Sequence, residues 1–328
     1  MRGDAVATTE MTLGGDAWGV VNATTQAQGN YLAVTTYGGE LTVDATQSST
    51  GGLVSATSQL GDDDARLLGG AYVNASAISN TTALYGEGAF LEGSIDQSSS
   101  ATVRAYNRIE TQYIPAEAVV DAQAIVNAVQ ATSLQTSGQD LAIIQTSTGD
   151  FVEAESSANS GNAWDLAGRA RTSANQAVLY NQGGSVVASA RQDNTAYVRA
   201  AATTTAYDYG RAEAHARGAA NELSVGNNDI YVEIDNAQFN SGGVNVTATF
   251  GGTNGYDVYV GADAAGNRVT GYSCADCGGY LEARNTQSNS GDVSATANTS
   301  VAGSTRSVIT GSNAVGNSAT FYVSRPAN

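Results

Sequence analysis

A short segment recurs along this chain of 328 residues at nearly constant spacing. QSSTGGLVSATS, from Gln47, and QSNSGDVSATA, from Gln287, share most of their letters although 240 residues separate them. Four similar segments lie between them, and successive copies are 50, 48, 47, 46 and 49 residues apart. They begin at Gln47, Gln97, Gln145, Gln192, Gln238 and Gln287. A fixed period of this length predicts a repeat architecture.

A second anchor, an asparagine, keeps the same phase. It lies 17 residues before the glutamine in four repeats and 20 before Gln287, whereas the third repeat has Ala128 at this offset. These anchors are Asn30, Asn80, Asn175, Asn221, Asn267 and Asn317. They predict one solenoid domain over 1–328, with repeats 30–79, 80–127, 128–174, 175–220, 221–266 and 267–316, a partial unit 317–328, and a partial coil or cap at 1–29.

Each repeat has the pattern of short β-strands. Apolar residues alternate before the glutamine, as at Leu41, Val43 and Ala45, and a second strand begins at a valine such as Val54. Alternation with period two indicates a strand with one face turned inward. A glycine recurs at one offset in the intervening turn, where we expect a positive φ; these glycines are Gly51, Gly149, Gly242 and Gly291.

The repeat therefore predicts an all-β fold. A single unit cannot bury its own apolar face, so units stack along an axis into a β-solenoid. We expect a right-handed parallel β-helix in which each repeat of roughly 48 residues makes about two coils, giving a rod roughly 60–70 Å long. Residues 114–131, IPAEAVVDAQAIVNAVQA, locally resemble an amphipathic helix. Their position in the repeat favours a strand.

The glutamine anchors share the parity of the inward residues, so their amides need partners inside the solenoid. Two structural interpretations are open. Stacked Asn and Gln side chains can bond to one another along the axis, or both residues can occupy corners because of their turn chemistry. In either case we expect the anchors to be structural.

The charge of the chain limits its partners. Its formal net charge is −17, and all 14 basic residues are arginine. Nucleic acid binding needs a clustered positive surface, so neither nucleic acid nor an anionic membrane is an expected partner. No apolar run approaches the roughly 20 residues of a transmembrane helix, so no membrane-spanning segment is expected.

Catalytic chemistry has little support in the sequence. His215 is the only histidine and lies in an alternating strand pattern, and no serine has a convincing His/Asp constellation around it. The acidic run Asp62–Asp64 matches no calcium-loop spacing. We therefore expect no cofactor, no metal and no enzymatic activity. The alternative is a β-helix enzyme acting on polysaccharide, a lyase or a carboxylate-pair glycoside hydrolase, because a fold does not determine a function.

Aromatic residues are the candidates for ligand binding. Tyrosines recur five residues after the asparagine anchor at Tyr85, Tyr180, Tyr272 and Tyr322. If they form an outward column, they can stack on sugar rings or simply cover the strand surface. Loops after the second strand add Trp164, Tyr207 and Tyr256. Repeated loops on one edge of a solenoid often form its binding face.

The motif CADC contains both cysteines, Cys274 and Cys277, and coincides with the lengthened asparagine–glutamine spacing. A zinc site would need four ligands, which the chain lacks there, and a redox motif would need a different context. We interpret the pair as a small disulfide that closes a bulged turn in an extracytoplasmic protein.

The Gln/Asn-anchored units, together with GNSATFYVSRP from Gly316 and TGYSCADCGG from Thr270, resemble the holdfast-anchor surface proteins of stalked bacteria. The Gln–Gly units resemble curlin-like repeat proteins more weakly. The first resemblance implies an extracellular, outer-membrane-associated protein that fixes an adhesive polysaccharide to the cell, with polysaccharide or other anchor proteins as partners. It transfers no catalytic residues. Open β-ends also make an end-to-end homopolymer an expectation.

Overall fold

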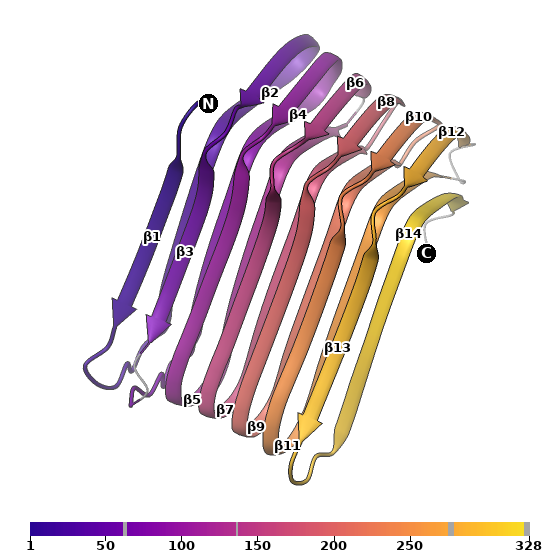
Figure 1. Cartoon of the computed structure of the whole chain (residues 1–328). Coiled ribbons are helices and arrows are strands. Elements are labelled where there is room, and N and C mark those ends of the chain that lie inside the picture. Colours follow the sequence, from indigo (N-terminus) through magenta and orange to yellow (C-terminus); the bar gives the residue numbers. More distant parts are fainter. Residues whose placement is uncertain (62–63, 136, 275–278, 325–328) are drawn as a thin grey trace.

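The structure is a computed structural model that describes residues 1–61, 64–135, 137–274 and 279–324. Within these residues the chain forms fourteen strands, and all of their pairings are parallel. The strands are β1 (Ala5–Thr12), β2 (Val21–Ser49), β3 (Leu53–Gly61), β4 (Ala71–Ser99), β5 (Thr102–Leu134), β6 (Gly138–Ser147), β7 (Phe151–Asn181), β8 (Ser185–Asn194), β9 (Tyr197–Asn227), β10 (Tyr231–Asn240), β11 (Val244–Cys274), β12 (Tyr280–Asn289), β13 (Val293–Val301) and β14 (Ser307–Ser324). The predicted all-β parallel solenoid is confirmed (Figure 1).

Each repeat makes one coil, so the prediction of two coils per repeat is wrong. A coil consists of one long strand and one short strand, such as β7 and β8. Every strand pairs with the strand one repeat away, as in Val152↔Val198 and Gln192↔Gln238. The long strands turn back on themselves, and one coil therefore uses a whole repeat (Figure 1). With strands about 4.8 Å apart, seven coils make a stack roughly 30–35 Å long.

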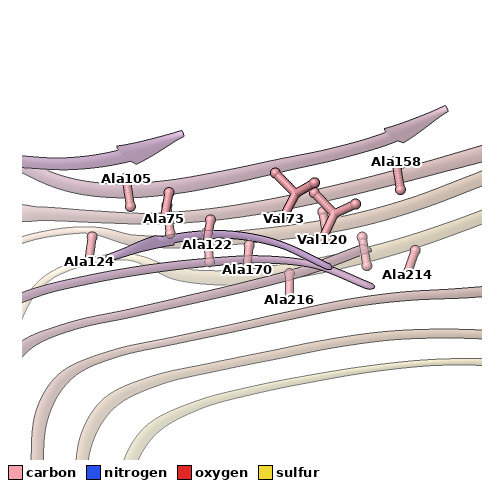
Figure 2. Packing of buried hydrophobic residues seen from close by; sticks show 14 of the residues in the cluster. Val73, Ala75, Ala105, Val120, Ala122, Ala124, Ala158, Ala170, Ala214 and Ala216 are labelled. Carbon is pink, nitrogen blue, oxygen red and sulfur yellow. The ribbon is translucent and has the colours of Figure 1, made fainter. Parts of the chain in front are cut away.

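Two apolar cores run along the stack, one in each of two lobes. In β7, the first half and the middle of the strand both contribute to the larger core, for example through Ala154 and Ala170. The end of β7 and the short strand β8 form the smaller core, for example through Leu179 and Val186. Alanine dominates the larger lobe, and Figure 2 shows this small-residue packing on successive strands. Methyl-sized side chains let two layers of strand pack closely.

Asparagine and glutamine ladders separate the two lobes. Each asparagine Nδ2 donates to the Oδ1 of the asparagine in the next coil, over 2.7–2.8 Å, along Asn30, Asn80, Asn127, Asn175, Asn221, Asn267 and Asn317. Each glutamine Nε2 donates in the opposite direction, over 2.7–2.9 Å, along Gln287, Gln238, Gln192, Gln145, Gln97 and Gln47. The anchors are therefore stacked in ladders rather than placed at corners.

The two ladders also tie the two sides of each coil together. Asn175 Nδ2 donates to the backbone oxygen of Asp193, at 2.9 Å, and Gln145 Nε2 donates to that of Gln176, at 3.0 Å. The same pair of bonds recurs in the other repeats. An interior amide thus finds partners for both of its N–H groups and for its carbonyl oxygen, as burial requires. These bonds join the two sides of each coil between the two lobes. We call this joined part of the coil the waist.

Two details of the repeat differ from the sequence prediction. Asn127, rather than Ala128, occupies the ladder in the third repeat, 18 residues before its glutamine, so that repeat begins one residue earlier. Residues 114–131 form part of the strand β5, which confirms the position-based prediction over the helical one. The register of the β5–β7 pairing shifts between Ile114 and Glu117.

Glycine recurs at one turn position of the repeats, but the predicted positive φ is not the general reason. Only Gly51 has a positive φ, of 65°. At Gly149, Gly242 and Gly291 a Cβ would overlap a backbone oxygen of the preceding coil. Close stacking of the turns therefore requires glycine there.

The sheet is not closed, and both ends of the stack carry edge strands. At one end β1 pairs only with β3 and β2 only with β4; at the other, β12, β13 and β14 each pair with a single earlier strand. Figure 1 shows these strands flanking the stack. No helix in the described part of the chain could cross a membrane.

Candidate functional site

An exposed aromatic corner lies where the long strands turn back in the larger lobe. Trp164 of β7 and Tyr256 of β11 are 61% and 52% exposed. They occupy equivalent positions two coils apart, because their neighbours Asp165 and Asp257 both pair with Arg211 of the intervening coil. The two ring centroids are 6.1 Å apart in an edge-to-face arrangement. The sequence-predicted residues Trp164 and Tyr256 thus form one surface.

Gly210 makes this contact between the two rings sterically feasible. It lies in the intervening coil between Tyr209 and Arg211, and a Cβ there would be 2.8 Å from the Cε3 of Trp164. A side chain on this residue would therefore displace the indole. The aromatic corner, defined as Trp164, Gly210 and Tyr256, borders shallow pockets of about 300 Å³ and about 280 Å³.

Charged groups surround the first of these pockets. The Arg306 guanidinium lies 5.5 Å from the centre of the Tyr256 ring, and its Nε donates to Asp257 Oδ1 over 2.9 Å. This hydrogen bond to Arg306 lowers the pKa of the Asp257 carboxyl. Burial raises the pKa of Asp165, although Arg211 opposes the shift. Exposed rings beside paired charges are suited to stacking on a polar ring and to hydrogen bonding its substituents.

Tyr207 lies near this corner, in β9, and is 62% exposed. No ring contact joins it to Trp164 or Tyr256 among the residues that the structure describes. The neighbouring Tyr209 is instead buried in the larger core and packs edge-to-face on Phe250, with the ring centroids 5.0 Å apart.

The four repeated tyrosines share one register column in the smaller lobe, but other residues interrupt it. Thr132 stands between Tyr85 and Tyr180, and Gly226 stands between Tyr180 and Tyr272. Tyr272 and Tyr322 are stacked, with their ring centroids 5.9 Å apart and an interplanar angle of 18°.

Hydrogen bonding and burial further limit this column as a binding surface. Asn228 donates to the hydroxyl of Tyr180 over 2.8 Å and accepts from that of Tyr272 over 3.1 Å. Tyr322 is 45% exposed, whereas Tyr85, Tyr180 and Tyr272 are half-buried. The column therefore offers less open aromatic surface than the aromatic corner.

The remaining sequence candidates lie apart from these surfaces. Cys274 is buried at the end of β11, and its predicted partner Cys277 lies outside the described residues, as do Asp62 and Asp63. His215 is half-buried on β9 beside Tyr259, with ring centroids 6.0 Å apart. Burial lowers the pKa of His215. No cluster of three His, Cys, Asp or Glu side chains suited to a metal occurs among the described residues.

The sequence patterns did not predict two groups of structurally notable residues. Asn194, Asn240 and Asn289 form a further ladder, with Nδ2–Oδ1 distances of 2.8 and 2.6 Å. Its signal was visible two residues after the glutamine, where the first three repeats have serine. Arginines of three repeats also line a groove at the waist. Arg171 and Arg217 both lie four residues before an asparagine anchor, whereas Arg268 directly follows Asn267, so the shared offset of the first two was the only signal in the repeat pattern.

Comparison with known proteins identifies the family. A family model described as holdfast attachment protein D (HfaD) matches residues 1–243, about three quarters of the chain. The matched span includes the repeats up to Gln238 but not the two C-terminal segments that also suggested the resemblance. No curated protein and no solved structure matches the chain. The chain belongs to the holdfast attachment protein D family, and its role is in holdfast attachment at the cell surface.

Proposed function

We propose that this chain is a non-enzymatic structural protein that anchors an adhesive polysaccharide to the outer membrane. The observation that carries the proposal is the aromatic corner, which presents two contacting and exposed rings on a chain of the holdfast attachment family. The faces of Trp164 and Tyr256 can stack on sugar rings, and the adjoining carboxylates and guanidinium groups can hydrogen-bond sugar hydroxyls. Many weak contacts of this kind along a polymer add up through effective concentration.

The test is to replace both rings, with Trp164→Ala and Tyr256→Ala together, and to measure polysaccharide retained on cells. Tyr280→Ala is the control, because Tyr280 is 54% exposed on β12, a strand that packs on the smaller core, in the other lobe from the aromatic corner. We expect the double variant to reduce retention several-fold and the control to leave it unchanged. Unchanged retention in the double variant, at equal surface abundance, would contradict the proposal.

The tyrosine column is a secondary candidate for the same role. Changing Tyr85, Tyr180 and Tyr272 to Ala tests it in the same retention assay. Because these side chains are half-buried, we expect a smaller loss than at the aromatic corner. Retention equal to that of the wild type would remove the column from the binding surface.

Self-association end to end is part of the proposal. The glutamine ladder has an open position at each end of the described chain. At the C-terminal end, Gln287 donates through Nε2 but its Oε1 accepts no hydrogen bond from the described residues. At the N-terminal end, Gln47 Nε2 donates, within this part of the chain, only to the backbone oxygen of Thr81, which leaves one of its two N–H groups for a further ladder bond. A second copy stacked head to tail would continue this ladder in its own direction. The register would also place β13 against β1 and β14 against β2.

A charge on one edge strand tests this assembly. Val308 of β14 continues the inward column of Val258 yet is 44% exposed, because no coil covers it. Val308→Lys should shorten the assemblies seen by sedimentation and negative-stain microscopy, since an inward charge opposes docking. Ile309→Lys is the control, because Ile309 is 60% exposed and follows the outward Tyr259. Equal assembly by both variants, or a strictly monomeric wild type, would contradict end-to-end association.

Catalytic turnover would overturn the non-enzymatic part of the proposal. Purified protein is incubated with surface polysaccharide, and the products are assayed for new reducing ends and for unsaturated sugars, the respective signatures of a hydrolase and a lyase. We expect neither product above a heat-denatured control.

A further inference from the structure

A polar groove runs across the outside of the waist, where the long strands bend inward at the asparagine ladder. It has a volume of about 630 Å³. Residues from β5, β7, β9, β11 and β14 line it. It therefore crosses five adjacent coils and extends along the axis for roughly 20 Å. We call it the waist groove.

The two walls of the waist groove carry polar groups at the spacing of the coils. Gln123, Arg171 and Arg217 form one register column on one wall. The opposite wall carries a second column, which consists of Gln176, Glu222, Arg268 and Ser318. A ligand that lies along the groove meets an amide, a guanidinium, a carboxylate or a hydroxyl at each coil. Such regular spacing suits a linear polymer with a repeating unit of similar length.

The charge of the lining differs from that of the whole chain. Three arginines and one glutamate line the waist groove, so the lining carries 3 − 1 = +2, whereas the chain carries −17. Two further carboxylates just outside the lining bring the local sum to 3 − 3 = 0, so an extended anion is repelled less here than by a chain of net charge −17. Asp121 and Asp263, outside the lining, pair with Arg171 and Arg268.

The ion pairs hold the guanidinium groups without using all of their donors. Arg171 contacts Asp121 through Nη2, and Arg217 contacts Glu222 through Nη2. Arg268 Nη2 donates to Asp263 Oδ2 over 2.9 Å. Each guanidinium has five N–H donors in a planar fork, so each keeps donors for a ligand carboxylate. The side chains of Arg171 and Arg217 are 53% and 40% exposed, which leaves these donors accessible.

We propose that the waist groove binds an extended acidic glycan, with its sugar carboxylates paired to Arg171, Arg217 and Arg268. The glycan lies along the solenoid axis, and the serine and threonine hydroxyls of the groove contact its neutral hydroxyls. The inference rests on the proposed polysaccharide-anchoring function, and it assigns part of the recognition to a surface other than the aromatic corner.

The experiment compares two probes that differ in charge. Oligogalacturonate is the acidic probe, and the same oligomer with its carboxylates methyl-esterified is the neutral one. Titration calorimetry at low salt should show the acidic oligomer binding at least about tenfold more tightly. Arg217→Gln with Arg268→Gln should weaken the acidic oligomer at least about tenfold. Equal affinity for both probes, or wild-type affinity in the double variant, would overturn the proposal.

Two further variants separate binding from folding. Arg171→Gln removes the most exposed of the three groove arginines, which pairs with Asp121, and it should weaken the acidic oligomer while circular dichroism at the assay temperature still shows a folded protein. Arg284→Gln is the matched control, because Arg284 is 67% exposed, lies on β12 outside the groove and pairs with Glu282. Loss of binding in the Arg284 variant equal to that in the groove variants would assign the effect to net charge and overturn the proposal.

The retention assay on cells distinguishes failure of this inference from failure of the proposed function. If oligogalacturonate does not bind but replacement of Trp164 and Tyr256 still releases polysaccharide from cells, the groove inference fails and the anchoring function stands. If neither the groove variants nor the aromatic variants change retention, the anchoring function fails, whatever the oligomer binding shows.

Discussion

At the residue scale, the ladder amides of the inner coils combine full burial with hydrogen bonds on all sides. Asn175 accepts from Asn127 and donates both to Asn221 and to the backbone oxygen of Asp193. It is fully buried, so water cannot replace a lost partner. Leaving a buried donor or acceptor unsatisfied costs about 1–3 kcal/mol.

Asn175→Ala should therefore lower the free energy of unfolding by about 2–4 kcal/mol, because its three partners lose their bonds together. Chemical denaturation followed by circular dichroism measures the change. Asn159→Ala is the matched control, because Asn159 lies exposed on the same strand and accepts one bond, from Thr205. A loss in Asn175→Ala no larger than in the control would show that the ladder does not stabilise the fold.

A second prediction at this scale concerns the effect of His215, the only histidine, on the pH dependence of stability. Burial is the largest cause that lowers the pKa of His215; nearby Arg169 and Arg217 also lower it, while Glu213 and Asp263 oppose the shift. Its folded pKa thus lies below the unfolded value near 6.5. The unfolded chain then binds the proton more readily, so stability falls as the pH drops through 6.5 towards the folded pKa.

The free energy of unfolding should thus decline more steeply between about pH 7 and pH 5 in the wild type than in His215→Gln. Denaturation curves across this range provide the measurement, and the imidazole proton resonances give the folded pKa directly. Parallel pH dependences for the two proteins, or a folded pKa above 6.5, would contradict the role of burial.

At the element scale, the sequence predicted the strands well because each inward face alternates with an outward one. The phase of the repeat correctly placed 114–131 in a strand despite its local helical pattern. The coil count could not be read in the same way. The recurring aromatic loops at Trp164, Tyr207 and Tyr256 mark the point where the chain turns back, but the strands continue through it with only single-residue gaps in their pairing, so these loops did not show how many coils one repeat makes. The waist groove was missed because it depends on how the long strands bend.

The turn glycines allow successive coils to stack closely. A Cβ at Gly242 would overlap the backbone oxygen of Ala196 in the preceding coil, which cannot move aside as a side chain can. Gly242→Ala should therefore lower the free energy of unfolding by about 1–3 kcal/mol. Gly311→Ala is the control, since a Cβ there meets no atom within 4 Å. Equal stability of the two variants would show that the turns have room for a side chain.

At the scale of the whole molecule, one coil per repeat sets the spacing of every surface feature. The aromatic corner spans three coils, and the waist groove spans five. Both surfaces are therefore short and rigid, and extending them along a polymer depends on the end-to-end stacking proposed above. The sequence singled out Trp164 and Tyr256 from their recurring loops, but only the coil geometry brought their rings into contact.

The distance between the two ends of one register column tests this geometry most directly. Thr24 and Gly311 are both exposed and lie six coil steps apart in a column through Asn74, Asp121, Arg169, His215 and Gly261. Spin labels are attached through Thr24→Cys and Gly311→Cys, with Cys274 and Cys277 changed to Ser. Pulsed electron spin resonance should give a distance centred near about 30 Å; about 60 Å, the value for two coils per repeat, would contradict the structure.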